Sequence, residues 1–211
     1  CRQSFIKLLP QFEDKTFVVK NCHDFNGIRD FAKNGAVSLP DDKLNIVTVA
    51  RFGREKGVLR AIRAVSKSGC KDLLRYYLIG NGAEFEQAKA LINELNLSKT
   101  VFLLGEMQNP YGYIKAADLL LIPSYSEAAP MVIGEAACLG TPILSTETSS
   151  SEEMIVSGGC GFVCENSEDG ITESLEKIEK NRELLREKAA FLNSQNFSNA
   201  NALKQFSELV K

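Results

Sequence analysis

Short apolar runs rich in β-branched residues alternate along the chain with longer segments in which apolar residues recur at helical spacing. This alternation predicts β-α units and a parallel sheet. The runs expected to form strands are 15–20, 44–50, 74–80, 100–105, 118–123 and 141–146, with a short one at 161–165. Nearly continuous apolar strands, such as DLLLIP at 118–123, are typical of a sheet covered on both faces.

Helices are expected between these strands and after them. The predicted helices are 56–68, 83–96, 110–117, 130–139 and 151–157, then one or two charged surface helices in 167–192 and a final helix in 200–211. The pattern predicts an α/β, Rossmann-like, three-layer domain with a mostly parallel sheet of about six to seven strands. We expect a helical lead-in at 1–14, the Rossmann-like domain at 15–192 and a C-terminal helical segment at 193–211.

Composition narrows the class of protein. The chain has 211 residues, 44% hydrophobic and 25% charged, which suffices for one large domain or two small ones. A net charge of -2 gives no electrostatic reason to expect nucleic acid as a partner. No apolar run approaches the roughly 18 to 20 residues that span a bilayer, and the first residues lack a signal-peptide core. We therefore expect a cytoplasmic protein.

The cysteines do not form a metal-binding pattern. There are six, at 1, 22, 70, 138, 160 and 164, with no CxxC pair and only one histidine, His23. This argues against structural zinc and predicts free thiols. Their roles cannot be assigned from the sequence.

In open parallel sheets, ligands bind outside the carboxyl ends of the strands. The loop ARFGREKG at 50–57 follows a strand and carries Arg51, Arg54 and Lys56. One interpretation is a solvated surface loop. The other is an anion site in which an arginine fork and a lysine flank a diphosphate.

The next two loops give weaker signals. Gly80 and Gly82 follow a strand as in a dinucleotide fingerprint, but Phe85 occupies the third glycine position, so a tight turn is favoured over an NAD site. After the following strand, residues 105–107 could build a flat apolar slot for a nucleotide base, with Tyr111 on the next helix. Ordinary loop and capping residues would look the same.

The stretch PSYSEAAPMVIGEAACLGTP at 123–142 holds two carboxylates, Glu127 in the loop and Glu135 in the helix. Pro130 suits the first helical position, which leaves the next N–H groups free for an anion. Both acids reach one cleft, where carboxylates could accept sugar and ribose hydroxyls of a nucleotide sugar. Alternatively, Glu127 caps the helix and Glu135 is solvated.

These residues resemble the retaining glycosyltransferases of family 4, also called group 1, which have the two-domain GT-B fold. The family's two glutamates separated by seven residues are matched by Glu127 and Glu135. Pro-Ser at 123–124 and Gly-x-Pro at 140–142 frame them as the family pattern requires.

The upstream signature of the family is matched as well. Its arginine and lysine correspond to Arg51 and Lys56, which excludes Arg54. A turn at 20–24 matches more loosely. The resemblance covers nearly the whole chain.

The resemblance implies the C-terminal, donor-binding half of a nucleotide-sugar-dependent transferase. The implied nucleotide-sugar-binding residues are Arg51, Lys56, Gly105, Glu106, Met107, Glu127, Ala128, Ala129, Pro130, Met131, Val132 and Glu135. Glu135 would hold the ribose, Glu127 with residues 128–130 the sugar, and the N–H groups of Met131 and Val132 the phosphate. Arg51, Lys56 and Glu127 are the candidate catalytic residues.

The resemblance also implies partners and limits. The donor would be a UDP or GDP type sugar. The acceptor, a saccharide or lipid-linked molecule as in polysaccharide biosynthesis, would be bound by an N-terminal domain that is missing here and toward which 193–211 would pack.

Since there is no Asp-x-Asp motif and two cations face the leaving group, no cofactor or metal is expected. The configuration of the sugar would be retained. The isolated chain should bind nucleotide without transferring sugar, and contact of the full-length protein with the inner face of the membrane is left open.

Two alternatives remain from the residues themselves. One is a non-catalytic nucleotide-binding sensor module on the same scaffold. The other is an NAD-dependent oxidoreductase domain, favoured only by Gly80 and Gly82.

The chain departs from the family pattern at three places. Ala128 and Cys22 stand where glycine is usual, so a positive φ at Ala128 would strain the loop. The loop at 148–151 is Thr-Ser-Ser-Ser instead of glycine-rich, and donor or acceptor contacts could differ there.

Overall fold

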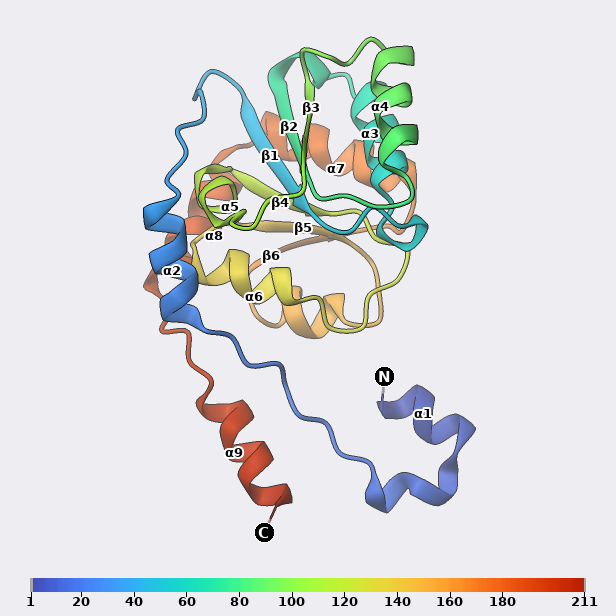
Figure 1. Ribbon diagram of the computed structural model, residues 1–211, viewed down its shortest axis with the longest axis vertical. Coiled ribbons are helices and arrows are strands. Elements are labelled where there is room, and N and C mark those ends of the chain that lie inside the picture. The colour runs from blue at the N-terminus through green and yellow to red at the C-terminus, as the bar shows by residue number, and fades with distance from the viewer. Residues whose placement is uncertain (1, 211) are drawn as a thin grey trace.

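Six parallel strands form the centre of the computed structural model, which describes residues 2–210 apart from the side chain of Ser4 (Figure 1). The strands are β1 Leu44–Val49, β2 Leu74–Ile79, β3 Val101–Gly105, β4 Leu119–Ile122, β5 Ile143–Thr146 and β6 Gly161–Cys164. Their order is β3-β2-β1-β4-β5-β6, and every pair is parallel. The order reverses between β1 and β4, which is where such sheets bind ligands. The predicted Rossmann-like α/β fold is confirmed.

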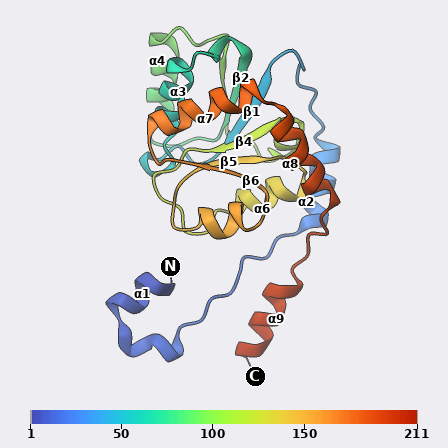
Figure 2. The same cartoon turned by 180° about the vertical axis from the view of Figure 1, so that it is seen from behind.

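Helices cover both faces of this sheet, whereas the first and the last helix extend away from it (Figures 1 and 2). In chain order, the helices are α1 Arg2–Leu8, α2 Phe25–Asn34, α3 Val58–Lys67, α4 Phe85–Glu94, α5 Tyr111–Ala116, α6 Met131–Cys138, α7 Glu168–Lys180, α8 Glu183–Ser194 and α9 Ala200–Leu209. Short 3-10 turns lie at Pro10–Lys15, Arg54–Lys56 and Lys71–Leu73, and a π-helical turn at Glu152–Val156. One buried cluster joins the sheet to α3, α4 and α7, and a second joins it to α2, α5 and α6.

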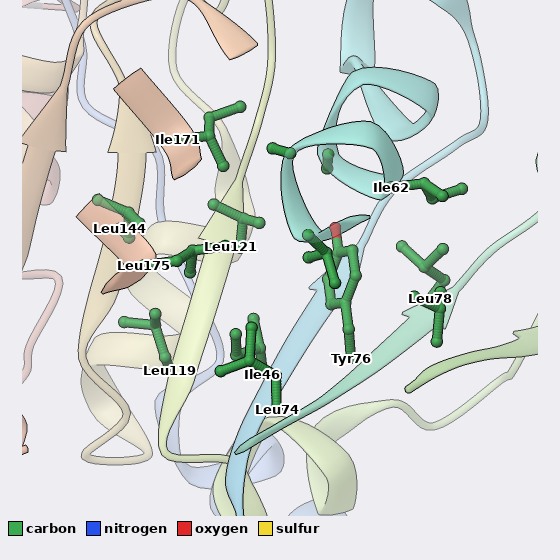
Figure 3. Close-up of a cluster of buried hydrophobic side chains, with 14 of the residues drawn as sticks. Ile46, Ile62, Leu74, Tyr76, Leu78, Leu119, Leu121, Leu144, Ile171 and Leu175 are labelled. Atoms are coloured by element: carbon green, nitrogen blue, oxygen red, sulfur yellow. The ribbon is translucent and has the colours of Figure 1, made fainter. Parts of the chain in front are cut away.

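Successive strand residues point to opposite faces, and both faces are buried. Ile46 and Tyr76 belong to the cluster beneath α3 and α7, whereas their neighbours Val47 and Tyr77 belong to the other cluster. Figure 3 shows the first cluster, with strand side chains meeting those of the two helices. The hydroxyl of fully buried Tyr76 lies 2.8 Å from the hydroxyl of Thr48, so this polar group is satisfied inside the core.

The prediction of a strand at 15–20 is wrong. This segment leaves a 3-10 turn and runs on without joining the sheet, whose edges are β3 and β6. Phe17 and Val18 are 62% and 55% exposed. β-branched residues favour an extended backbone, but a strand also needs a neighbouring strand, and none lies here. The first element on the sheet is instead α2, which was not predicted; the side chain of Asp24 caps it by accepting from the N–H of Gly27 at 2.9 Å.

The lead-in and the tail extend away from the sheet on the same side of the molecule, as Figures 1 and 2 both show. They meet where His23 and Asn199 exchange hydrogen bonds: the N–H of His23 donates to Oδ1 of Asn199 at 3.0 Å, and Nδ2 of Asn199 donates to the carbonyl of His23 at 2.7 Å. Residues 1 and 211, at the ends of the predicted lead-in and final helix, lie outside the described residues. The domain boundaries at 15 and 192 stay predictions.

Buried free thiols account for most of the cysteines. Those buried are Cys70, Cys138, Cys160 and Cys164, whereas Cys22 is exposed and free. Burial raises the pKa of the Cys160 thiol to about 11, so it is protonated and unreactive at neutral pH. The prediction of free thiols is confirmed for these five; Cys1 lies outside the described residues.

Among helices within 2–210, none combines the length and apolarity needed to cross a bilayer.

Candidate functional site

A cavity of about 250 Å³ lies at the carboxyl ends of β1 and β4, against the first turn of α6. It is lined by Thr48, Val49, Ala50, Arg51, Lys56, Leu120, Leu121, Ile122, Pro123, Ser124, Glu127, Pro130, Met131, Val132 and Glu135. The predicted site residues of two loops and one helix therefore meet here. Leu120 and Leu121 give the cavity an apolar floor, and its charged groups come from the rim.

A second hollow of about 650 Å³ adjoins the first and shares Val49, Ala50 and Arg51 with it. Its other walls come from the loops after β2 and β3, and include Glu106 and Met107. The two hollows adjoin at these shared residues and together make up a cleft at the carboxyl ends of β3, β2, β1 and β4. Because one end is wider and the other carries the carboxylates, the cleft suits an elongated ligand with two different ends.

The turn at Gly80 and Gly82 is built for close approach of two main chains. Both glycines have φ values that side chains rarely adopt, 140° and 154°. A Cβ at Gly80 would overlap the carbonyl oxygen of Ala50, and one at Gly82 would lie 2.6 Å from the carbonyl oxygen of Phe52. The predicted role of a tight turn beside the cleft is confirmed.

Glu127 is nearly buried and is held by two donors. Its Oε1 accepts from Nζ of Lys56 at 2.8 Å and from the hydroxyl of Ser124 at 2.6 Å, and its side chain is 9% exposed. Within residues 2–210, both bonds go to the same oxygen. Oε2 therefore keeps its lone pairs for a ligand hydroxyl.

The serine loop that departs from the family pattern touches the main chain of Glu127. The hydroxyls of Ser149 and Ser150 donate to its carbonyl oxygen at 2.9 and 3.4 Å. These two bonds tie residues 149 and 150 to the loop that carries Glu127.

The two predicted diphosphate cations differ in environment. Lys56 ends the 3-10 turn Arg54–Lys56, and its side chain is 26% exposed. Arg51 is 78% exposed and pairs with Glu55 at 3.1 Å, on the rim shared by both hollows. An exposed pair of this kind is weak and readily exchanged. Lys56 is therefore a fixed cation, whereas Arg51 is free to move onto a ligand.

Glu135 lies on α6 with its carboxylate toward the cavity. Partial burial raises the pKa of this carboxyl, because desolvation disfavours the charged form. No ion pair within residues 2–210 includes Glu135. A half-buried acceptor without a cation fits ligand hydroxyls better than a structural role at the surface.

The start of α6 is one residue later than predicted. Pro130 is the residue before the helix, with an extended backbone at φ -68° and ψ 124°, and Met131 is the first helical residue. The N–H groups of Met131 and Val132 therefore begin the helix and lack intrahelical acceptors. Both residues line the cavity, and N–H groups at a helix N-terminus are available to an anion.

Ala128 is not strained. Among residues 2–210, Asn96 is the only non-glycine residue with a positive φ, at 54°. The family's usual glycine is thus not needed for the backbone conformation seen at Ala128, nor at Cys22. Ala128, Ala129 and Gly105 do not line either hollow as these are formed by residues 2–210.

The sequence did not predict a role for Arg60 near the site. Arg60 lies in the first turn of α3, is 3% exposed, and donates from Nε to the carbonyl of Pro123 and from Nη2 to that of Ser124, both at 2.8 Å. The only signal in the sequence was an arginine on the buried face of an amphipathic helix, between Val58 and Ala61.

Residues 30–191 match the model of the family described as glycosyl transferases group 1. N-acetyl-alpha-D-glucosaminyl L-malate synthase of Bacillus anthracis is 27% identical over 142 residues, which make up 67% of this chain and 37% of that protein. The chain therefore spans little more than a third of this relative's length.

Solved structures share the fold. HepE of Anabaena, in complex with UDP, aligns with a TM-score of 0.77 at 20% identity, over 94% of this chain and 58% of that one. Sucrose-phosphate synthase of Thermosynechococcus elongatus aligns with a TM-score of 0.75 at 20% identity, over 98% and 55%. At these identities the similarity concerns the fold, and the chain corresponds to about half of each structure.

Proposed function

Because the chain belongs to the group 1 glycosyl transferases, we propose that it is the donor-binding half of an enzyme that transfers a sugar from a nucleoside diphosphate sugar. Its fold is one Rossmann-like half of the GT-B architecture. The acceptor, a saccharide, glycolipid or other molecule, would bind largely to the other half. Neither alternative, the sensor module or the NAD-dependent oxidoreductase, finds support in the similar proteins.

The proposal is carried by one observation. Lys56, Glu127, Glu135 and the first two residues of α6, Met131 and Val132, all line one cavity. A cation and a helix N-terminus attract phosphate, while two carboxylates can accept hydroxyls. A nucleoside diphosphate sugar presents both kinds of group in one molecule.

The cleft suggests how the donor would lie. The diphosphate would sit between Lys56 and the first turn of α6, with Arg51 leaving Glu55 to join it. Glu135 would accept the ribose hydroxyls, and the base would lie in the wider hollow near Glu106 and Met107. That HepE was solved with UDP supports a uridine nucleotide as the first donor to test, with GDP sugars next.

The sugar would lie at the other end of the diphosphate, against Glu127. Oε1 of this residue is taken by Lys56 and Ser124, so Oε2 would accept the sugar hydroxyl. Residues 128–130 would form the rim around the sugar through their main chain. Because Pro130 has no N–H, it contributes a fixed φ and a wall.

Negative charge grows on the diphosphate as the bond to the sugar breaks. Lys56 already stands next to the cavity, and Arg51 lies at its rim, so both would stabilise the departing group more than the intact donor. With two cations and a helix dipole on the leaving group, no metal is required.

We propose retention of the sugar's configuration, as in the family that the chain resembles. We also propose a cytoplasmic site of action, where contact with the inner membrane face would depend on a lipid-linked acceptor.

Calorimetry on the purified chain tests the proposal. UDP or GDP should bind, ADP and NAD should bind more weakly, and Arg51→Ala and Glu135→Ala should each abolish most of the affinity. Binding of NAD alone would refute it. A donor hydrolysis or transfer assay on the same chain should show no turnover, because acceptor binding and closure need the other half; turnover without a partner would contradict this part.

A further inference from the structure

Arg60 is a buried cation behind the wall of the cleft. No ion pair within residues 2–210 includes it, and burial lowers its pKa. A buried charge is tolerated only when it is well hydrogen-bonded. The acceptors of Arg60 are main-chain oxygens and one hydroxyl: Pro123 and Ser124 at 2.8 Å, and Oγ1 of Thr146 at 3.3 Å.

Two of these acceptors, the carbonyls of Pro123 and Ser124, belong to the segment that carries Glu127, and the carbonyl of Asn166 accepts a further bond from Nη1 of Arg60 at 3.5 Å. The guanidinium of Arg60 also lies 3.8 Å from the ring centroid of Tyr125, which adds a cation-π contact. Thr146 supports the same place, since its hydroxyl donates to the carbonyl of Ser124 at 2.5 Å. Three successive residues of the loop are thus held from the side opposite the ligand.

Ser124 connects this support to the carboxylate. Its carbonyl accepts from Arg60, and its hydroxyl donates to Oε1 of Glu127 at 2.6 Å. Ser124 is itself 2% exposed, so it has no freedom to turn while Arg60 holds its main chain. A displacement of Arg60 would be transmitted to Glu127 through this single residue.

We propose that Arg60 is a positioning residue, which fixes the main chain of Pro123 and Ser124 so that Ser124 holds Glu127 in place for the sugar. The inference rests on the proposed function only for the identity of the ligand at Glu127. A planar guanidinium reaches two carbonyls at once, whereas a lysine ammonium is a single point charge on a flexible stem. Arg60→Lys therefore keeps the charge and loses the geometry.

The binding experiment compares UDP with UDP-glucose. The ratio of their dissociation constants isolates the sugar, because both ligands share the diphosphate. In Arg60→Lys the affinity gained from the glucose should fall by about tenfold, to the level of Glu127→Ala, as expected for one charged hydrogen bond. The affinity for UDP itself should change much less. A variant that merely loosened the fold would weaken both ligands alike.

Arg63→Met is the matched control. Arg63 lies on the same helix, one turn after Arg60, and is bonded to Glu168 at 3.0 Å away from the loop. Its removal should leave the ratio unchanged. If Arg60→Lys keeps the wild-type ratio, Arg60 has no positioning role.

Hydrogen exchange tests the loop without any ligand. In Arg60→Lys, the amides of residues 124–129 should exchange about tenfold faster, while the amides of β1 keep the wild-type rate. In Arg63→Met, the amides of 124–129 should also keep the wild-type rate. Unchanged exchange at 124–129 in Arg60→Lys overturns the inference. If Arg60→Lys exchanges these amides faster but the chain binds no nucleotide, Arg60 does hold this loop in place. The proposed function is then refuted.

Ser124→Ala is the second variant, needed because loss of Arg60 leaves buried carbonyls unsatisfied and Arg60→Lys could unfold. It removes only the hydroxyl and keeps the bonds of Arg60. The glucose-dependent affinity should again fall by about tenfold, with slow exchange at 124–129 retained. A wild-type ratio in Ser124→Ala would overturn the link from Arg60 to Glu127.

Discussion

The ammonium of Lys56 lies 2.8 Å from Oε1 of Glu127, and these residues come from loops that follow different strands, β1 and β4. This ion pair joins the two loops across the cavity before any ligand enters. A diphosphate at Lys56 would share the cation with Glu127. The state of one residue therefore affects what the other can bind.

Lys56→Met should weaken both stability and nucleotide affinity. Glu127 would be left nearly buried without its cation, and the diphosphate would lose a charged hydrogen bond of roughly 1.5 to 3 kcal/mol, or about tenfold to a few hundredfold in UDP affinity. Adding Glu127→Gln should restore the melting temperature, because it removes the unpaired charge, and should leave UDP affinity low. Calorimetry of unfolding and of UDP binding measures the two effects separately.

Arg54→Met is the control for that pair. Arg54 is exposed, in the same 3-10 turn as Lys56, and lines neither hollow as formed by residues 2–210. Both its melting temperature and its UDP affinity should match the wild type. An equal loss in Arg54→Met and Lys56→Met would point to general surface charge as the source of affinity.

Arg51→Ala should reduce UDP affinity without lowering the melting temperature. Its pair with Glu55 is exposed in the free chain, and exposed ion pairs contribute little to stability. The UDP affinity of the wild type should fall with salt more steeply than that of Arg51→Ala, since one screened contact is missing in the variant. Titrations at low and high salt compare the slopes. Parallel slopes would show that Arg51 does not contact the diphosphate.

Glu135→Gln should make the chain more stable at neutral pH and impair nucleotide binding. The folded-state pKa of Glu135 is raised by burial above its ordinary value of 4.5, so the folded chain binds the proton more tightly than the unfolded chain. Its charge therefore lowers stability as pH rises through that raised pKa, and has no effect below 4.5, where both states are protonated. Melting curves at pH 4 and pH 7.5 should show a gain for the glutamine variant only at the higher pH.

UDP affinity of the wild type should fall at the acidic end of the same range. A protonated Glu135 has lost acceptor capacity toward the ribose hydroxyls. In Glu135→Gln that part of the pH dependence should vanish. If the variant kept the full acidic decline, another group would be responsible.

Chelation should leave donor binding intact. Since Lys56, Arg51 and the start of α6 surround the proposed diphosphate position, UDP affinity should be the same in excess EDTA and in magnesium. The full-length enzyme should likewise keep its transfer rate after metal removal. Loss of binding or turnover that magnesium restores would overturn the metal-free proposal.

Most of the sheet could be predicted because each strand carries its own signal, a short apolar run, which in the four inner strands is buried on both faces. The segment 15–20 carried the same signal and is no strand, since pairing depends on neighbours that local sequence does not contain. α2 carries a helical signal of its own, with Phe25, Ile28 and Ala32 at helical spacing after the capping residue Asp24, so the sequence did contain the information for this helix.

The candidate site was predicted as a set of residues but not as a network. Motif spacing placed Lys56 and Glu127 at one ligand, and both line the same cavity. Their direct ion pair could not be foreseen, because it depends on how two loops 71 positions apart approach each other. For the same reason Arg60 was not predicted: all but one of its acceptors are main-chain carbonyls, which every residue carries and which therefore leave no pattern in a sequence.

The exchange of hydrogen bonds between His23 and Asn199 has a mechanical consequence. When the chain is pulled from its two ends, the load reaches this clasp before it reaches the sheet. The two hydrogen bonds are loaded one after the other as the ends separate. They should therefore break at a lower force than two bonds loaded together. A first extension of the segments before α2 and after α8 should precede the main rupture of the domain, and the sheet should remain intact between the two events.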